Sequence, residues 1–312
     1  MSRRAVITGA FSYTGAAVAR ELLGRGWTVH TLTNRKPPPD CEEVTSAPLR
    51  FEPQHLKNEL AGADVFINTY WVRLPWAGQD FGTAVERSAM LIDAAKRAGV
   101  GKIVHISVSN AAKGRNLGYY RGKAEVEELV RDSGLQYSIV RPTLILGPGD
   151  VLTNNIAWFL RKFPVFPLPR GGRYRLQPVT LADTARITAD QAEATENEEV
   201  DAAGPDGYSY SEYVRLLAKM IGARALFVSV PNWLALGSSR IVGWLKRDIV
   251  LTKEELLGLQ QELLFSHEPP LGRESVADWL KEHGGKLGRY YANDLHRHFG
   301  AGAGVPIQNP VW

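Results

Sequence analysis

The chain has 312 residues, of which 44% are hydrophobic and 22% are charged, and its net charge is +4. These proportions are typical of a folded soluble protein with one large α/β domain, or with a domain and a substantial appendage. The basic residues are scattered, so we expect no nucleic-acid partner. The single cysteine, Cys41, lies in a proline-rich segment and is expected on a surface loop; it excludes an intrachain disulfide and a thiolate metal cluster.

Strand and helix signals alternate over roughly the first 140 residues, which predicts a parallel sheet with helices on both faces. Predicted strands cover, in chain order, residues 5–7, 28–32, 49–51, 65–68, 102–107 and 137–141. Helices are predicted to begin near Thr14, Pro53, Phe81 and Tyr119. We therefore expect a doubly wound α/β domain, a Rossmann fold, over residues 1–143.

Beyond Pro142 the alternation weakens. Helices are predicted over 154–162, from residue 181, and over 209–221 and 253–264, and a strand over 175–179. These elements predict a smaller, mainly helical substrate-side region made of 144–172 and 205–312, with 173–204 returning to the main sheet. The apolar stretch 228–245 is interrupted by Pro231, Asn232 and Arg240, so it is expected to form an amphipathic helix that covers a core.

The N-terminus leads directly into a strand, which leaves no room for a signal peptide. We expect a cytoplasmic monomer or homodimer that acts on a small-molecule substrate and has no membrane partner. The segment His296-Arg297-His298 lacks a supporting carboxylate or cysteine cluster, so no metal is expected.

The most informative segment follows the first predicted strand. Residues 8–15 read Thr-Gly-Ala-Phe-Ser-Tyr-Thr-Gly and open directly into a helical stretch. This is how a dinucleotide-binding βαβ unit begins, because the helix N-terminus offers N–H groups to a pyrophosphate. Ser12 stands where the usual spacing has a middle glycine. The predicted cofactor contacts in this segment are Gly9, Phe11, Ser12, Tyr13, Thr14 and Gly15.

The second predicted strand is followed by Asn34, Arg35 and Lys36. No acidic residue that could hold a ribose 2′-hydroxyl occurs between Trp27 and Pro39. Arg35 and Lys36 suit a 2′-phosphate instead, and the alternative is that they are solvated loop charges. The pattern favours NADP(H), with NAD(H) as the second choice. Asn68 and Pro142, at the ends of two further strands, complete the predicted cofactor contacts.

Tyr119 and Lys123 are four residues apart, so on a helix they share one face. An ammonium near a phenol favours the phenolate, which suits acid–base catalysis. Tyr120 is the competing tyrosine, three residues from Lys123. Ser107 and Ser109, at the end of the fifth strand, are equal candidates for a hydroxyl that binds a substrate oxygen, and either could instead bond backbone groups.

Aromatic residues follow the fourth strand, at the edge of the sheet where ligands bind in doubly wound folds. Tyr70 and Trp71 are therefore candidates for an apolar or aromatic substrate pocket, with core cover as the equal alternative. Asn155 and Trp158 are candidates from the C-terminal region.

Taken together, the glycine turn, 64–68, the Tyr119/Lys123 pair, 141–143 and 177–185 resemble extended and atypical short-chain dehydrogenases/reductases, and are most similar to their NmrA-like and NDUFA9-like branch. The resemblance covers roughly the first 190 residues. It implies NAD(P)H binding, with Tyr119 as the proton donor or acceptor, Lys123 supporting it, and Ser107 or Ser109 in the serine role. The function expected first is an NADP(H)-dependent oxidoreductase. A non-catalytic redox sensor or assembly subunit comes second, and a nucleotide-sugar epimerase third.

Overall fold

The computed structural model describes residues 3–38, 41–76 and 78–299. The chain divides into two compact units, and each is described by itself. Unit 1 is Met1–Pro142 with Leu181–Ala202, and unit 2 is Thr143–Thr180 with Ala203–Trp312.

Unit 1 is built on a parallel sheet. Within the described residues it has seven strands in the order β11-β6-β5-β4-β1-β2-β3. Their bounds are β1 Arg4–Thr8, β2 Thr28–Leu32, β3 Thr45–Ala47, β4 Val65–Asn68, β5 Lys102–Ile106, β6 Gln136–Pro142 and β11 Glu198–Ala202. Every residue of β4 and β5 is buried, as expected for central strands covered on both faces.

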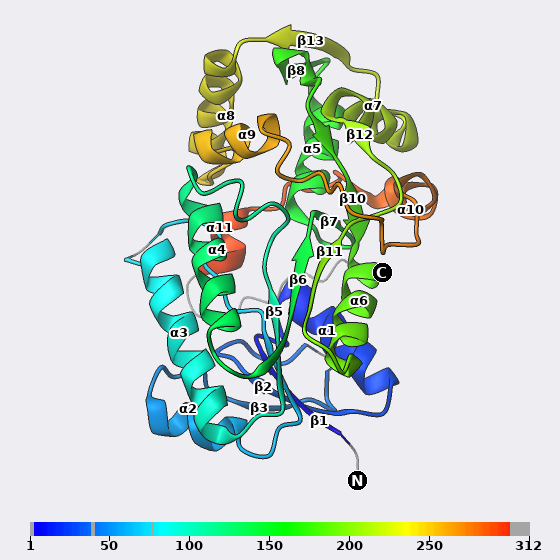
Figure 1. Cartoon of the computed structure of the whole chain (residues 1–312). Helices are drawn as coiled ribbons and strands as arrows, with labels where there is room; N and C mark the ends of the chain where they lie inside the picture. The colour runs from blue at the N-terminus through cyan, green and yellow to red at the C-terminus, as the bar shows by residue number, and fades with distance from the viewer. Residues whose placement is uncertain (1–2, 39–40, 77, 300–312) are drawn as a thin grey trace. The chain divides into compact units, whose positions relative to one another are not determined.

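Helices cover both faces of this sheet (Figure 1). One layer contains α1 (Tyr13–Gly24) packed against α6 (Leu181–Glu193), and the other contains α2 (Pro53–Leu60), α3 (Phe81–Ala98) and α4 (Gly118–Arg131). The second layer buries apolar side chains against the central strands, among them Leu56, Leu91 and Val126. The predicted Rossmann fold is confirmed.

Two local predictions in unit 1 were wrong. The third strand forms at Thr45–Ala47 and not at 49–51, because Pro48 has no N–H to donate to a ladder. Instead, the Leu49 N–H donates to Asn34 Oδ1 at 3.0 Å, and Asn34 Nδ2 donates to the Leu49 carbonyl oxygen at 3.1 Å. Cys41, expected on the surface, is buried.

Unit 2 combines helices with short strand pairs. β7 (Leu144–Leu146) pairs with β10 (Pro178–Thr180), β8 (Val165–Pro169) with β13 (Leu226–Val230), and β9 (Arg175–Leu176) with β12 (Tyr208–Ser209). The helices are α5 (Val151–Lys162), α7 (Tyr210–Ile221), α8 (Asn232–Lys246), α9 (Lys253–Gln260), α10 (Val276–His283) and α11 (Asp294–Phe299), with 3-10 turns η1 (Arg170–Gly172) and η2 (Gly284–Lys286).

These pairings correct the expectation that residues 173–204 return to the main sheet. Only β11 joins it, beside β6, whereas β9 and β10 pair within unit 2. The return is therefore limited to α6 and β11. The predicted amphipathic helix exists as α8, but of its residues only Ala235 and Gly243 are buried, so most of its apolar side chains do not cover a core.

Candidate functional site

The loop between β1 and α1 forms a tight turn. Gly9 has a φ of +70°, which glycine adopts without strain. Its N–H donates to the Leu32 carbonyl oxygen at 2.9 Å, and the Ser12 N–H donates to the Gly9 carbonyl oxygen at 2.8 Å. These bonds fix the turn against β2 and place the amino end of α1 at the carboxyl end of the sheet.

Gly15 lies in the first turn of α1 and packs on the backbone of Gly9. A Cβ atom at Gly15 would lie 2.2 Å from the Gly9 carbonyl oxygen, so only glycine fits. The Ser12 Oγ lies 3.1 Å from that Cβ position and 3.4 Å from the one at Gly9. The Ser12 side chain therefore lies between the two glycines of the turn.

The amino end of α1 is suited to an anion. Ser12 is the N-cap residue, its side chain makes no capping hydrogen bond, and the first turn contains no acidic residue. The first-turn N–H groups and the positive end of the helix dipole thus point out of the turn. A cradle of this shape fits the pyrophosphate of a dinucleotide. Of the other predicted contacts, Phe11 is buried and Tyr13 and Thr14 are half-buried.

Asn68 fixes the neighbouring edge at the end of β4. Its Oδ1 accepts the Tyr70 N–H at 3.1 Å and lies 3.3 Å from Thr8 Oγ1, which accepts the Thr69 N–H at 2.9 Å. The Thr69 Oγ1 lies 3.6 Å from the Cβ position of Gly9. The structure therefore brings the end of β4 beside the glycine turn.

The three residues predicted to contact the cofactor after β2 differ in their hydrogen bonds and in their exposure. The Asn34 amide is bonded to the Leu49 backbone. Arg35 is half-buried, and its N–H donates to Thr33 Oγ1 at 3.2 Å, whereas Lys36 is exposed. Of the three residues, Arg35 is the one that has a guanidinium side chain and a backbone held by a hydrogen bond to Thr33.

Lys123 is a buried ionisable group of unit 1. It lies on α4 with only 3% of its surface exposed, and its Nζ donates to the Ile106 carbonyl oxygen at the end of β5, at 2.8 Å. Burial lowers the pKa of Lys123 to about 7, partly opposed by the charge of Glu127. An ammonium with such a pKa can hold or release a proton near neutrality.

Tyr119, one helical turn before Lys123, lies in an aromatic cluster. Its ring packs edge-on against Trp71 at 5.9 Å, Phe81 at 5.8 Å and Tyr120 at 5.5 Å between centroids. Trp71 also stacks on Phe81 at 6.2 Å, and Lys123 Nζ lies 4.6 Å from the Trp71 ring centroid. Both Tyr119 and Lys123 therefore contact Trp71, and the structure brings the three residues together.

The two serines after β5 have different surroundings. Ser107 Oγ donates to Glu127 Oε1 at 2.6 Å. Ser109 is fully buried, and its N–H donates to the Pro142 carbonyl oxygen at 2.9 Å. Pro142, a predicted cofactor contact, is thus tied to the Ser109 segment.

Glu127 is a site residue that sequence reasoning missed. It lies four residues after Lys123, and it accepts from Arg141 Nε at 2.9 Å and from Arg131 Nη2 at 3.0 Å. The same two arginines bond Glu199, and the Arg131 bond together with Arg141 lowers the pKa of Glu199 to about 2. The continuation of the four-residue spacing from Tyr119 was the signal that could have identified Glu127.

The predicted substrate residues fall in different units. In unit 1, the Tyr70 hydroxyl accepts from Arg87 Nη1 at 3.1 Å. In unit 2, the Asn155 side chain bonds the Ala292 backbone at 2.8 and 2.9 Å, and Trp158 packs edge-on against Tyr291 at 5.2 Å. Asn155 and Trp158 thus make structural contacts within their own unit.

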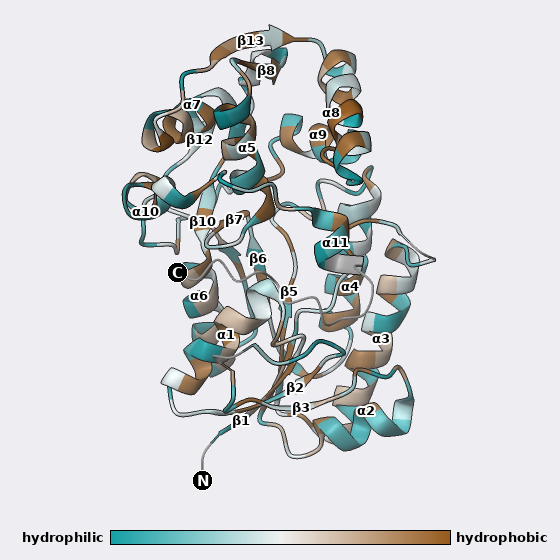
Figure 2. Ribbon diagram, turned by 180° about the vertical axis from the view of Figure 1, so that it is seen from behind, coloured by the Kyte–Doolittle hydropathy of each residue, from teal (hydrophilic) through white to brown (hydrophobic). Residues whose placement is uncertain are grey.

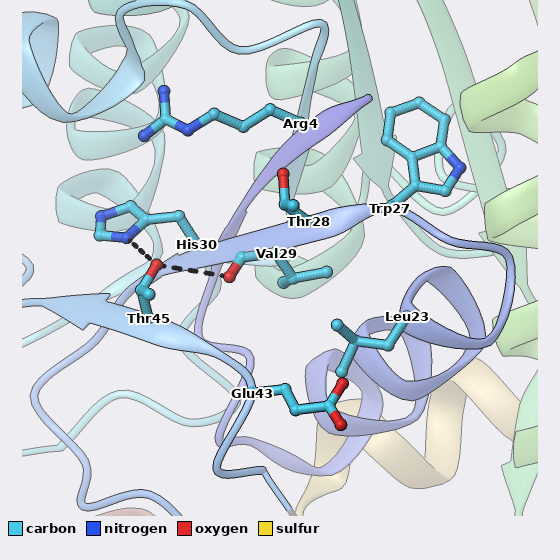
Figure 3. Close-up of a pocket in the computed structure, with 8 residues that line it drawn as sticks. All are labelled: Arg4, Leu23, Trp27, Thr28, Val29, His30, Glu43 and Thr45. Atoms are coloured by element: carbon cyan, nitrogen blue, oxygen red, sulfur yellow. Dashed lines mark hydrogen bonds between the residues drawn. The ribbon is translucent and has the colours of Figure 1, made fainter. Parts of the chain in front are cut away.

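A hollow in unit 1 lies among β1, α1, β2 and β3 (Figure 3). It is lined by Arg4, Leu23, Trp27, Thr28, Val29, His30, Glu43 and Thr45. Arg4 and Thr28 begin their strands, so the hollow is at the end of the sheet opposite the glycine turn. Its His30 ring is engaged with Thr45 at 2.9 Å and Glu59 at 3.0 Å. It is therefore not the cofactor cradle.

The described residues contain no group of three metal-ligating side chains, and none of their helices is long and apolar enough to cross a bilayer.

A family model described as NAD(P)H-binding matches residues 9–153, which include the glycine turn, Arg35 and the Tyr119/Lys123 pair. These residues are similar to NAD(P)H-binding domains.

The relatives of this chain include a reductase and an NADH dehydrogenase subunit. The chain is 27% identical over 232 residues to a ceramide reductase of Caulobacter vibrioides, covering 72% of this chain and 73% of that one. It is 24% identical over 192 residues to the mitochondrial NADH dehydrogenase [ubiquinone] 1 alpha subcomplex subunit 9 of Arabidopsis thaliana, covering 59% of this chain and 48% of that one. The predicted resemblance to this branch is confirmed.

Among solved structures, the NADPH-dependent quinone oxidoreductase QOR2 of Escherichia coli, in complex with NADPH, matches this chain with a TM-score of 0.73. The identity is 19%, over 89% of this chain and 99% of that one. At this identity the likeness shows the fold alone.

Proposed function

We propose that the protein is an NADP(H)-dependent oxidoreductase that interconverts a carbonyl and an alcohol on a small apolar or aromatic substrate. The observation that carries this proposal is the buried Lys123 Nζ at the carboxyl end of β5, one helical turn after Tyr119. An ionisable pair of this kind beside a dinucleotide cradle suits acid–base chemistry coupled to redox chemistry. The match of residues 9–153 to the NAD(P)H-binding family supports the cofactor class.

Each residue has a defined role in this proposal. When bound, the nicotinamide supplies or accepts a hydride. Tyr119 delivers the hydroxyl proton to the carbonyl oxygen, or removes it in the reverse direction, and the Lys123 ammonium favours the phenolate that results. Ser107 or Ser109 holds the substrate oxygen, and the Ser107 hydroxyl donates to Glu127. The aromatic cluster around Trp71 suits an apolar substrate.

The direct test is cofactor titration followed by a substrate screen. We expect the full-length protein to bind NADPH and to oxidise it in the presence of apolar ketones or quinones, with phenanthrenequinone and aliphatic ketones as the first panel. Binding is measured by NADPH fluorescence and turnover by the loss of the absorbance of the reduced cofactor. Failure to bind either NADPH or NADH contradicts the proposal.

Arg35→Ala is expected to reduce the preference for NADPH over NADH by about tenfold or more, because a guanidinium–phosphate bond is a strong charge-assisted interaction. The ratio of the two dissociation constants checks this. Lys36→Ala is the matched control, since Lys36 is exposed and is expected to change the ratio less. An unchanged ratio in Arg35→Ala contradicts the assignment of the 2′-phosphate to Arg35.

Lys123→Met is expected to remove a pH dependence of stability. The pKa of Lys123 is about 7 in the folded protein and about 10.5 when unfolded, so between these values only the unfolded chain binds the proton. The free energy of unfolding of the wild type therefore rises as the pH increases from 7 to about 10. The contribution is on the order of a few kcal/mol.

Urea unfolding across this pH range measures the effect, with exposed Lys96→Met as the control. We expect the Lys123→Met curve to be flatter than that of the wild type, and the Lys96→Met curve to follow the wild type. Parallel curves for the wild type and Lys123→Met would show that Lys123 is not buried in the neutral form.

A second candidate is a cofactor-binding subunit without turnover. Its specific support is the Trp71 ring, which lies over the Lys123 Nζ at 4.6 Å, together with the similarity to a subunit of NADH dehydrogenase. The two candidates differ in one measurement. Tight NADPH binding without oxidation of any carbonyl in the panel favours the subunit.

A further inference from the structure

The helix α8 of unit 2 presents its apolar side to solvent. Trp233, Ile241 and Trp244 are 72%, 64% and 80% exposed, and Leu234 and Leu245 are exposed as well. Monomeric soluble proteins seldom expose so many large apolar side chains along one element, and such surfaces mark interaction sites. Figure 2 shows brown, hydrophobic bands along this helix and on β13.

The exposed residues lie on one side of the helix. At 100° per residue, the arc from Trp233 through Trp244 and Ile241 to Leu234 and Leu245 spans about 120°. The buried residues Ala235 and Gly243 lie outside this arc. The side with Ala235 and Gly243 faces the rest of unit 2, where α8 packs against β8. The helix is therefore amphipathic in the opposite sense to a core helix, with its apolar arc outward.

The charge around this arc has one sign. Between Glu212 and Asp248 the sequence has six basic residues and no acidic residue. Arg240 lies on α8 and Arg247 directly after it, and both are exposed, whereas the Lys246 Nζ lies 5.0 Å from the Trp158 ring centroid. Asp248, which ends the basic stretch, is buried and accepts the Tyr291 hydroxyl at 2.7 Å. A partner surface that complements α8 is thus apolar where it meets the arc and anionic where it meets the basic residues around the arc.

The two serine hydroxyls in the middle of α8 donate to carbonyl oxygens of the same helix. Ser238 Oγ donates to the Ala235 carbonyl oxygen at 3.0 Å, and Ser239 Oγ donates to the Leu236 carbonyl oxygen at 2.9 Å. Internal hydroxyl bonds of this kind lower the cost of moving a helix into a dry interface. Tryptophans at both ends of the helix suit the boundary between headgroups and acyl chains, where an amphipathic ring is favoured.

We propose that α8 docks the protein onto an anionic lipid surface, with its apolar arc in the headgroup–acyl boundary and the arginines Arg240 and Arg247 on lipid phosphates. This is peripheral binding, and it departs from the expectation that no membrane is a partner. It does not depend on the proposed function. A helix of 15 residues with two tryptophans, isoleucine and leucines outward, and basic residues beside them, has the chemistry of interfacial helices.

The test is flotation of the full-length protein with vesicles of phosphatidylcholine that contain phosphatidylglycerol. We expect binding that weakens with salt, and Trp233→Gln/Trp244→Gln to lose at least about tenfold in partitioning. Arg240→Gln/Arg247→Gln is expected to lose roughly fivefold for each charge removed, on anionic vesicles only. Trp76→Gln is the matched control, because Trp76 is an exposed tryptophan of unit 1 and is expected to leave partitioning unchanged.

Thermal melts and NADPH titrations of each variant check that the fold is intact. Both are expected to match the wild type, because the substituted side chains of α8 are exposed. Equal partitioning of the wild type and Trp233→Gln/Trp244→Gln overturns the proposal, as does wild type that stays off anionic vesicles. A wild-type dimer in analytical ultracentrifugation that the tryptophan variant converts to a monomer, without vesicle binding, assigns the arc to a second copy of the chain and also overturns it.

Discussion

Tyr119→Phe is expected to lower kcat for carbonyl reduction by about a hundred- to ten-thousandfold, the range that a positioned general acid contributes. The substitution removes only the hydroxyl. The ring contacts with Trp71, Phe81 and Tyr120 depend on the aromatic ring and are retained in phenylalanine. NADPH affinity is therefore expected to change by less than about twofold, because the cradle at Gly9 and Gly15 is untouched. Steady-state turnover on the best carbonyl of the panel and NADPH titration measure the two quantities.

Tyr120→Phe is the matched control for this experiment. Tyr120 is the adjacent tyrosine on α4, is buried, and is three residues from Lys123 rather than four. We expect its removal to leave kcat within a few-fold of the wild type. Loss of turnover in Tyr120→Phe alone transfers the acid–base role to that residue. Full turnover in Tyr119→Phe eliminates the proposed mechanism while leaving cofactor binding intact.

The parts of the fold that the sequence predicts are those set by local patterns. The glycine turn, the alternation of strands and helices and the four-residue spacing of Tyr119 and Lys123 depend on neighbouring residues, and all reappear as β1, α1 and α4. The exception at 49–51 is also local in origin. Pro48 stops the ladder one residue before the predicted strand, and a prediction that takes this proline into account places the strand at Thr45–Ala47.

The contacts that define the candidate site are not local. Lys123 bonds the Ile106 carbonyl oxygen, and Ser107 bonds Glu127, across gaps of 17 and 20 residues. No period or spacing indicates such a pair, because the partner is chosen by the packing of α4 on β5. The same holds for α8. The sequence predicts an amphipathic helix there, but the period of its apolar residues does not state which surface covers the apolar side.

Gly15→Ala is expected to disrupt both stability and cofactor binding. The new Cβ would lie 2.2 Å from the carbonyl oxygen and 2.8 Å from the carbonyl carbon of Gly9, and both are backbone atoms that no rotamer can move. α1 must then shift away from β1, which costs packing at the sheet and pulls the first-turn N–H groups from the phosphate position. We expect a loss of stability of at least about 2 kcal/mol and NADPH affinity weakened by about a hundredfold.

Gly24→Ala provides the control within the same helix. Gly24 is the last residue of α1, and a Cβ there meets no atom within 4 Å. Replacing glycine by alanine at an open helical position is expected to be neutral or to stabilise by up to about 1 kcal/mol. Comparing the two alanines separates a steric requirement at the cradle from a general effect of alanine in α1. If Gly15→Ala binds NADPH as tightly as Gly24→Ala, the close approach of α1 to the turn is not what holds the cofactor, and the pyrophosphate must bind elsewhere in unit 1.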